Sequence, residues 1–264
     1  MTQDKHLLLP VTLVRNGFAE AAMLSFVSHA AYPELSRRVG DILRGDEASY
    51  YATLTEERRK KDFLTGRASA KKALAALLDQ VCEQDIEIKR GVFLQPVVAL
   101  SGNDPLAVSI SHGGRISAAI SYPAGHPCGL DLEMISSNDF HVMQSAISVE
   151  ELPHPKAGVT EAQRYTRAWS VKEALSKILC CGLTVPFPLL NIGSETAWDG
   201  EIWRGRFCNF PQYVFLSLAT EGMVFSMVHP ARTKVECDFH RVMAFMADNR
   251  TARGQGDVYT PLTM

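Results

Sequence analysis

The sequence predicts an α+β fold built from two similar halves. Two segments with helical periodicity, 64–78 and 161–179, each precede short apolar runs that are typical of β-hairpins. A shift of 101 positions aligns the two segments and pairs identical residues: Thr65 with Thr166, Ser69 with Ser170, Lys71 with Lys172, Ala73 with Ala174, and Leu74 with Leu175. We therefore expect a duplicated unit with the functional site between the halves; chance likeness of two helices rich in Ala and Lys is the alternative.

The composition is that of an ordinary globular protein. The chain has 264 residues, 46% hydrophobic and 21% charged, which argues against disordered, fibrous and coiled-coil classes. Its formal charge of -2 gives no reason to expect a nucleic acid or a membrane surface as partner. No apolar run is long enough to span a bilayer, and Arg15 follows the apolar N-terminal stretch closely. We expect a cytoplasmic chain whose six cysteines, none in a CxxC pair, are reduced thiols.

Periodicity and turn residues predict the elements in chain order. Apolar residues three and four positions apart indicate helices, and short apolar runs bounded by Gly and Pro indicate strands. We expect scaffold at 1–45, helices at 55–61 and 64–78, a hairpin of 107–111 and 116–122, a strand at 128–135, a capping box at Ser148 and Glu151, a helix at 161–179 ended by Gly182, and strands at 202–207, 213–219 and 223–228. The halves are predicted at 1–125 and 126–250, with a flexible tail at 251–264.

The sharpest motif is the run GLDLE at 129–133. In a strand, alternate side chains share a face, so Asp131 and Glu133 point one way and the two leucines point to the core. Two adjacent carboxylates repel unless a cation lies between them, and oxygen ligands of this kind suit magnesium. The alternative is an exposed strand face with two solvated acids.

A second motif is the run WSVKEALSK at 169–177. Trp169, Glu173 and Lys177 are four residues apart, so a helix places them along one side. The alternative is a surface ion pair of small energetic value. The aromatic residue on the same side favours a partly buried stripe, where a bare charge pair needs a ligand or a metal.

A third motif is the run SISHGG at 109–114. The two glycines after His112 allow the backbone to approach a ligand, and the side chains of Ser111 and His112 can bind a phosphate. A hydrolase nucleophile is not indicated, because adjacent strand residues face opposite ways and no G-x-S-x-G elbow occurs. The alternative is a polar hairpin turn.

In this order the three motifs resemble those of the 4'-phosphopantetheinyl transferase superfamily, over about residues 50 to 185. Each motif is common, but the ordered set is rare. The length resembles that of the Sfp-type members, which are monomers made as pseudodimers of an α+β fold. The short homotrimeric holo-acyl-carrier-protein synthase type fits poorly. The resemblance therefore implies an α+β fold with pseudo-twofold duplicated halves.

The resemblance also implies an activity. Members move the 4'-phosphopantetheine arm of coenzyme A to a serine of an apo carrier protein, acyl or peptidyl, and release adenosine 3',5'-bisphosphate. By this likeness Asp131, Glu133 and Glu173 would hold Mg2+, and Glu173 or a water on the metal would be the base. Lys177 would contact the phosphate and steady the departing group. Ser111 and His112 would receive the 3'-phosphate of coenzyme A.

Two further cofactor-binding positions follow from the likeness. Arg67, after the basic run 58–61, resembles the arginine of a family segment that reaches the nucleotide phosphates; a solvated basic helix face is the alternative. Gln95, before Pro96, stands where many members have the lysine of a Gly-Lys-Pro turn. Glutamine donates only a neutral hydrogen bond, so one cation is in doubt here.

Other functions fit parts of the pattern. A metal-dependent pyrophosphate hydrolase would use the same three carboxylates and lysine with water as nucleophile. An inactive carrier-protein-binding module would keep the fold alone, but an unused acidic cluster has no evident stabilising value. The carrier is expected to dock at the apolar segment 178–190, with Phe187 as a contact; Phe187 as a core residue is the alternative.

Overall fold

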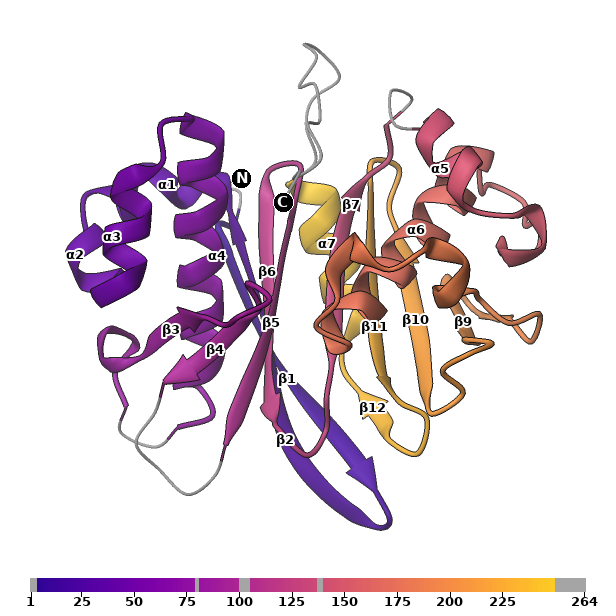
Figure 1. Cartoon of the computed structure of the whole chain (residues 1–264), viewed down its shortest axis with the longest axis horizontal. Helices are drawn as coiled ribbons and strands as arrows, with labels where there is room; N and C mark the ends of the chain where they lie inside the picture. The colour runs from indigo at the N-terminus through magenta and orange to yellow at the C-terminus, as the bar shows by residue number, and fades with distance from the viewer. Residues whose placement is uncertain (1–3, 79–80, 100–104, 137–139, 250–264) are drawn as a thin grey trace.

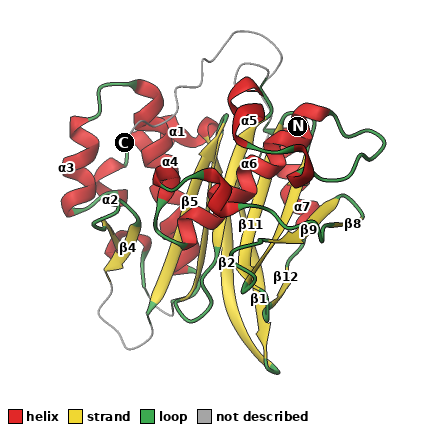
Figure 2. Ribbon diagram, turned by 45° about the vertical axis from the view of Figure 1, so that its right-hand side comes forward, coloured by secondary structure: helices red, strands yellow, loops and turns green. Residues whose placement is uncertain are grey.

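Two five-stranded antiparallel sheets form the centre of the molecule and confirm the α+β class (Figure 1). The computed structural model describes residues 4–78, 81–99, 105–136 and 140–249. One sheet has the strand order β12-β1-β2-β6-β5 and the other the order β7-β11-β10-β9-β8. The main helices α4 and α6 each pack on one of these sheets, and the turned view shows both with the sheets between them (Figure 2).

The elements have the following bounds. The strands are β1 His6–Arg15, β2 Phe18–Ser28, β3 Glu87–Arg90, β4 Pro96–Ala99, β5 Leu106–Gly113, β6 Ile116–Pro123, β7 Gly129–Met134, β8 Ala197–Asp199, β9 Ile202–Arg206, β10 Tyr213–Ala219, β11 Met223–Pro230 and β12 Lys234–Glu236. The helices are α1 Tyr32–Ser36, α2 Val39–Ile42, α3 Gly45–Thr53, α4 Glu57–Ala75, α5 Phe140–Ala146, α6 Glu161–Ile178 and α7 Phe239–Asp248.

The same order of elements occurs twice along the chain. In the first half β2 leads to α4, the small β3–β4 hairpin and the β5–β6 hairpin; in the second, β7 leads to α6, β8–β9 and β10–β11. Both times the first strand pairs with the last, β2 with β6 and β7 with β11, and the long helix packs on the three joined strands. This order supports the predicted duplication. The boundary predicted at residue 125 lies in the connection between β6 and β7, and remains a prediction.

A buried ion pair also recurs at aligned positions of the two helices. Lys71 on α4 and Lys172 on α6 are fully buried, and each Nζ lies 2.6 Å from a buried carboxylate, of Glu47 and Glu151 respectively. Each glutamate also accepts a hydrogen bond from the backbone N–H three residues before it, which confirms the capping box predicted at Ser148. Chance likeness of two helices does not explain a shared buried partner.

The largest core lies between the two sheets. Apolar side chains of β1, β2 and β6 meet those of β7, β10 and β11, and α7 adds its buried face to them. The chain then closes on itself: β12 pairs antiparallel with β1, and the side-chain amide of Asn249 donates to the backbone oxygen of Asp4 at 3.3 Å. The first and last described segments therefore lie together.

The helix predictions are confirmed in the second half and corrected in the first. The segment 161–179 forms α6, but the two helices expected at 55–61 and 64–78 are one helix, α4. Gly66 does not interrupt it; a Cβ there would lie 3.3 Å from Ile110, so the glycine lets the helix pack closely on β5. Helix α6 ends before Gly182, because Cys180 already takes a left-handed conformation at φ 52°.

The strands predicted from residue 107 onward are confirmed, but the first 45 residues hold more structure than expected. They contain the long β1–β2 hairpin, which turns at Asn16 and Gly17 with φ of 52° and 81°. The tail predicted at 251–264 lies outside the described residues. None of the helices in the described ranges has the length and apolar composition that crossing a bilayer requires.

Candidate active site

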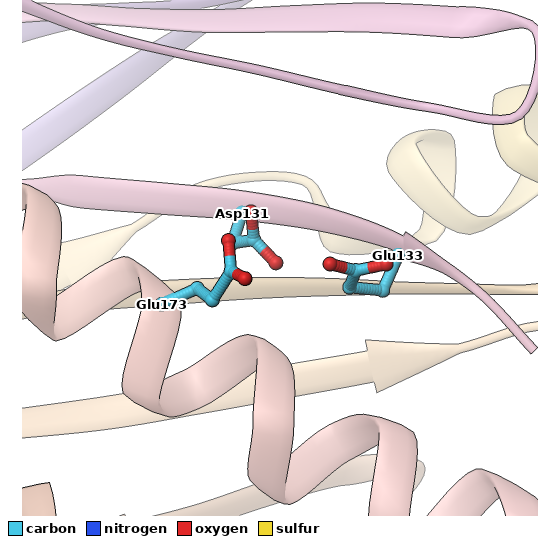
Figure 3. Close-up of side chains that lie close together, drawn as sticks. All are labelled: Asp131, Glu133 and Glu173. Carbon is cyan, nitrogen blue, oxygen red and sulfur yellow. The ribbon is translucent and has the colours of Figure 1, made fainter. Parts of the chain in front are cut away.

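Strand β7 and helix α6 approach each other closely because Gly129 has no side chain. A Cβ atom at Gly129 would lie 2.1 Å from the backbone oxygen of Ala174, so no larger residue fits without a backbone shift. Along β7 the predicted alternation is confirmed: its two leucines are in the main core, and its acids lie beside α6 (Figure 3). The glycine therefore sets the separation between the strand and the helix that carry the candidate ligands.

The structure brings the three predicted metal ligands together. Carboxylate oxygens of Asp131, Glu133 and Glu173 lie within 4.8 Å of one another (Figure 3). The side chains of Asp131 and Glu133 are only 2% and 7% exposed, which excludes the alternative of two solvated acids on a strand face. Three converging acids, two of them buried, need a compensating positive charge.

Glu173 is held by a tryptophan one turn before it on α6. The indole Nε1 of Trp169 donates to Glu173 Oε1 at 3.0 Å. Burial, reinforced by the negative charge of Asp131, raises the pKa of Glu173 to about 7, although Lys177 and the indole act in the opposite direction. A carboxyl group with this pKa is partly ionised at neutral pH, where it can exchange a proton.

The donor set fits a hard divalent cation. Asp131 Oδ2 is buried and has no hydrogen-bond partner, and the other ligand atoms of the cluster are carboxylate oxygens. Magnesium takes oxygen ligands and usually retains waters and substrate phosphate oxygens. A cation here would satisfy the orphan oxygen and remove the repulsion that raises the Glu173 pKa.

Lys177 lies beside the acidic cluster rather than pairing with Glu173. Its Nζ donates to Asp131 Oδ1 at 2.8 Å, to Ser111 Oγ at 2.8 Å and to the backbone oxygen of Leu130 at 2.9 Å. An ammonium group has three N–H donors, so all three are engaged. A phosphate that meets Lys177 would replace at least one of these partners.

Two serines of the SISHGG motif join the halves of the molecule. Ser109 Oγ accepts from the Leu130 N–H at 3.1 Å, and Ser111 Oγ accepts from the Leu132 N–H at 3.2 Å. Gly113 permits this contact, since a Cβ there would lie 2.7 Å from the Leu132 oxygen. Serine hydroxyl groups of β5 therefore accept hydrogen bonds from the backbone of β7, in place of backbone-to-backbone hydrogen bonds between these strands. The sequence pattern did not predict this role.

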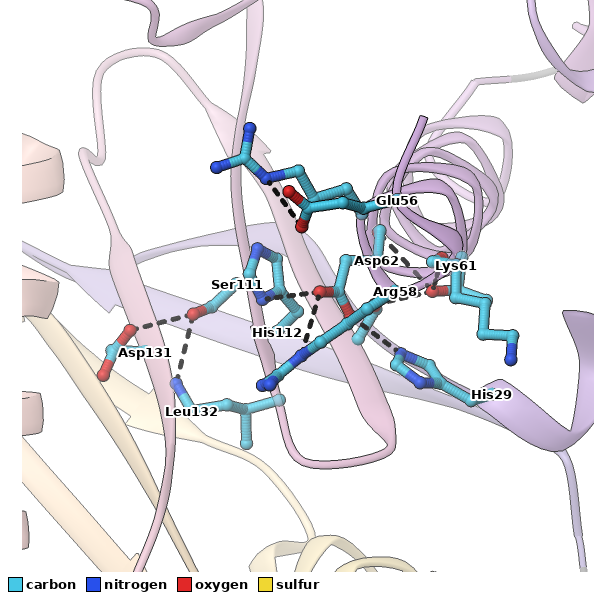
Figure 4. A network of polar contacts seen from close by, with 12 residues as sticks. His29, Glu56, Arg58, Lys61, Asp62, Ser111, His112, Asp131 and Leu132 are labelled. Carbon is cyan, nitrogen blue, oxygen red and sulfur yellow. Dashed lines mark hydrogen bonds and ion pairs between the residues drawn. The ribbon is translucent and has the colours of Figure 1, made fainter. Parts of the chain in front are cut away.

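Ser111 and His112 do not converge on one point. The hydroxyl of Ser111 donates to Asp131 Oδ1 at 2.8 Å and faces β7, whereas Nδ1 of His112 faces Asp62 on α4, at 3.8 Å (Figure 4). Ser111 is buried, and the side chain of His112 is 39% exposed. Of the two residues predicted to bind phosphate, His112 is the one that solvent reaches.

The ion pair and ring contact of Arg67 and the hydrogen bond of Gln95 do not involve the acidic cluster. Arg67 is buried, its Nε lies 3.1 Å from Glu47 Oε1, and its guanidinium stacks over Phe63 at 4.7 Å, which excludes a solvated helix face. Gln95 is half-buried in the β3–β4 turn, where its side-chain oxygen accepts from the Phe93 N–H at 2.9 Å. No contact of either residue bears on coenzyme A, and both roles remain predictions.

Phe187 packs on α6. Its ring lies 4.6 Å from that of Trp169, and Nζ of Lys172 lies over it at 5.3 Å. These contacts favour the core alternative for Phe187, while Leu189 next to it is 49% exposed. Docking of a carrier at the segment 178–190 remains a prediction.

A family model places this site in a known group. The model, described as the 4'-phosphopantetheinyl transferase superfamily, matches residues 127–218. This segment contains β7 and α6 and therefore all three acids of the cluster. The matched segment makes up about a third of the chain and is similar to this superfamily. The match confirms the resemblance to the superfamily for the motifs at 129–133 and 169–177, which lie within it. The motif at 109–114 precedes the matched segment, and the Sfp type remains a prediction.

Solved structures of holo-acyl-carrier-protein synthases share a partial likeness with this chain. The holo-(acyl-carrier-protein) synthase of Bacillus anthracis str. Ames in complex with CoA (3',5'-ADP) is 18% identical, with a TM-score of 0.35, over 44% of this chain and 97% of that one. The holo-ACP-synthase of Plasmodium yoelii is 18% identical, with a TM-score of 0.33, over 46% and 97%. The acyl carrier protein synthase of Mycobacterium tuberculosis is 20% identical, with a TM-score of 0.29, over 44% and 96%. No curated protein matches the chain.

Proposed function

We propose that this protein is a 4'-phosphopantetheinyl transferase that moves the phosphopantetheine arm of coenzyme A to a serine of an apo carrier protein. The observation that carries the proposal is the convergence of Asp131, Glu133 and Glu173 within 4.8 Å, inside the segment that matches the superfamily. The proposal includes dependence on Mg2+, release of adenosine 3',5'-bisphosphate, and an Sfp-type monomer.

The three acids would hold the magnesium ion. When bound, the ion would neutralise negative charge on the pyrophosphate as the bond to the leaving phosphate breaks. Trp169 fixes the Glu173 carboxylate by its hydrogen bond of 3.0 Å to Oε1. Glu173, or a water on the metal, is the candidate base for the carrier serine.

The remaining groups would bind the cofactor. Lys177 places a positive charge next to the acids and would contact phosphate by exchanging one of its present acceptors. His112 is exposed on the other face of β5 and would receive the 3'-phosphate. Apolar contact with the carrier would involve the exposed Leu189 beside the site.

A transfer assay with mass readout tests the proposal. The protein is incubated with coenzyme A, Mg2+ and a panel of apo acyl and peptidyl carriers, and the carriers are then weighed. Gain of one phosphopantetheine group supports transfer, and chelation of the metal should abolish the gain. Cleaved coenzyme A with unmodified carriers would instead show a hydrolase, and unchanged reactants with bound carrier would show an inactive binding module.

A further inference from the structure

Asp62 lies between two histidines that come from different parts of the first half. Its Oδ1 is 3.1 Å from Nε2 of His29, which follows β2, and its Oδ2 is 3.8 Å from Nδ1 of His112 on β5 (Figure 4). Nε of Arg58, one turn earlier on α4, is 3.9 Å from the same Oδ2. One carboxylate thus faces three groups that carry positive charge when protonated.

The surroundings keep Asp62 ionised. Burial acts to raise its pKa, but the contact with His29 at 3.1 Å and the charges of both histidines and Arg58 outweigh burial and lower it. At His112, burial lowers the pKa and Lys177 and His29 add to this effect, whereas Asp62 is the largest influence in the opposite direction. The net effect is a lowered pKa of His112, which Asp62 opposes by favouring the imidazolium form.

Exposure separates the two histidines. The side chain of His29 is 12% exposed and that of Asp62 is 13% exposed, so a ligand does not reach either easily. The side chain of His112 is 39% exposed, and its inner nitrogen is the one that faces Asp62. At 3.8 Å the Asp62 carboxylate is an ion-pair partner of Nδ1 rather than a hydrogen-bond acceptor, and it favours this ring orientation. In the doubly protonated ring, Nε2–H is then free to donate outward.

We propose that Asp62 is a positioning residue for the cofactor: it holds His112 with Nδ1 inward so that Nε2–H donates to the 3'-phosphate of coenzyme A, and His29 anchors the far oxygen of Asp62. This inference rests on the proposed function. Asp62 would thus increase the preference of the protein for coenzyme A over 3'-dephospho-coenzyme A without itself contacting the ligand. The Asp62 carboxylate by itself would weaken binding, because it repels a nearby phosphate. This repulsion is offset when the positive charge of His112 compensates the carboxylate.

Calorimetry of coenzyme A and 3'-dephospho-coenzyme A tests the inference without requiring transfer. Asp62→Asn should weaken coenzyme A binding about 10-fold and leave the dephospho ligand unchanged. Glu57→Gln is the matched control, since Glu57 is an exposed acid on the same helix that pairs with Lys61 instead. In a His112→Ala background Asp62→Asn should cause no further loss. Tighter binding of coenzyme A by Asp62→Asn, or an equal further loss without His112, overturns the inference.

Two measurements keep the test decisive if Asp62→Asn is poorly folded. His29→Gln, which frees the far oxygen of Asp62, should cause a smaller loss that is again confined to coenzyme A. The 1H–15N spectrum of the wild-type protein with bound coenzyme A should show His112 protonated at both ring nitrogens, and a His112 with a bare Nδ1 or Nε2 contradicts the positioning role. Discrimination between the ligands without transfer to any carrier would reject the proposed function alone, whereas transfer without discrimination would reject only this inference.

Discussion

Asp131 uses its two carboxylate oxygens differently. Oδ1 accepts from Ser111 and Lys177, both at 2.8 Å, while Oδ2 is buried without a hydrogen-bond partner. One oxygen therefore stabilises the fold and the other is available to a cation. Substitutions at this residue should separate the two roles.

We predict that Asp131→Asn loses transfer by at least about 100-fold with little change in melting temperature. The amide oxygen can still accept from Ser111 and Lys177, but an N–H group then occupies the place of the orphan oxygen. Asp131→Ala should in addition lose about 2 kcal/mol of stability, because the Lys177 ammonium is left without its carboxylate. Mass-detected transfer and thermal melting check both variants. If the two variants are equally stable, the hydrogen bonds to Oδ1 do not stabilise the fold.

The raised pKa of Glu173 predicts a pH dependence of stability in the metal-free protein. The folded state binds this proton up to about pH 7, whereas the ordinary pKa is 4.5. Binding of this proton by Glu173 therefore contributes fully to the stability of the folded protein below the ordinary pKa. The contribution is lost as pH rises through about 7. Melting curves without metal should show this loss between about pH 5 and 8, and Glu173→Gln should remove it. Added Mg2+ should stabilise the wild type most at the upper end of this pH range, where the acids are ionised. If the stabilisation by Mg2+ does not depend on pH, the ion does not bind to these ionised acids.

The contact between β7 and α6 depends on a single glycine. We predict that Gly129→Ala destabilises the protein by about 2–3 kcal/mol and lowers transfer further than the stability loss explains. The new Cβ would lie 2.1 Å from a backbone oxygen, so the strand has to move and carries Asp131 away from Glu173. Gly125→Ala is the control, because a Cβ there meets no atom within 4 Å. Melting and transfer rates of both variants give the comparison, and an unaffected Gly129→Ala would show that the spacing is not critical.

Elements with a regular apolar pattern were predictable, and those with a mixed pattern were not. Helix α6 was predicted to within one residue at its end. Helix α4 was divided because Thr65, Ser69 and Lys71 are buried, so its inner face is partly polar. In β1, Leu8 is 41% exposed beside its buried neighbours, which hides the alternation of a strand. The dipeptide Asn16-Gly17 is typical of hairpin turns and is the signal that would have indicated the β1–β2 hairpin.

The candidate site shows the same limit. Asp131 and Glu133 are two residues apart on a strand, and Trp169, Glu173 and Lys177 are four apart on a helix, so local geometry predicted which side chains share a face. The partners of Ser109 and of Asp62 come from other elements. Pairing through space carries no regular spacing along the chain, and only the folded structure revealed it.

At the scale of the molecule, one chain supplies every part of the candidate site. Ser111 on β5 belongs to the first half, and the acids and Lys177 on β7 and α6 belong to the second. We predict that the protein is a monomer and that transfer per molecule is constant on dilution. Light scattering and assays over a wide range of protein concentration check this. Activity that falls on dilution would show that a second copy completes the site.

The contact between Asn249 and Asp4, together with the pairing of β12 with β1, makes the backbone nearly a closed ring. The position of the N- and C-termini along the chain should then have little effect on folding. We predict that a circular permutant, with Asn249 joined to Asp4 by a short linker and new ends between Ala124 and Gly125, folds and keeps the transfer activity of the wild type. Both new ends are exposed, and the break lies between β6 and β7. Melting and transfer measurements decide, and a permutant that fails to fold would show that the order in which the halves are made is itself required.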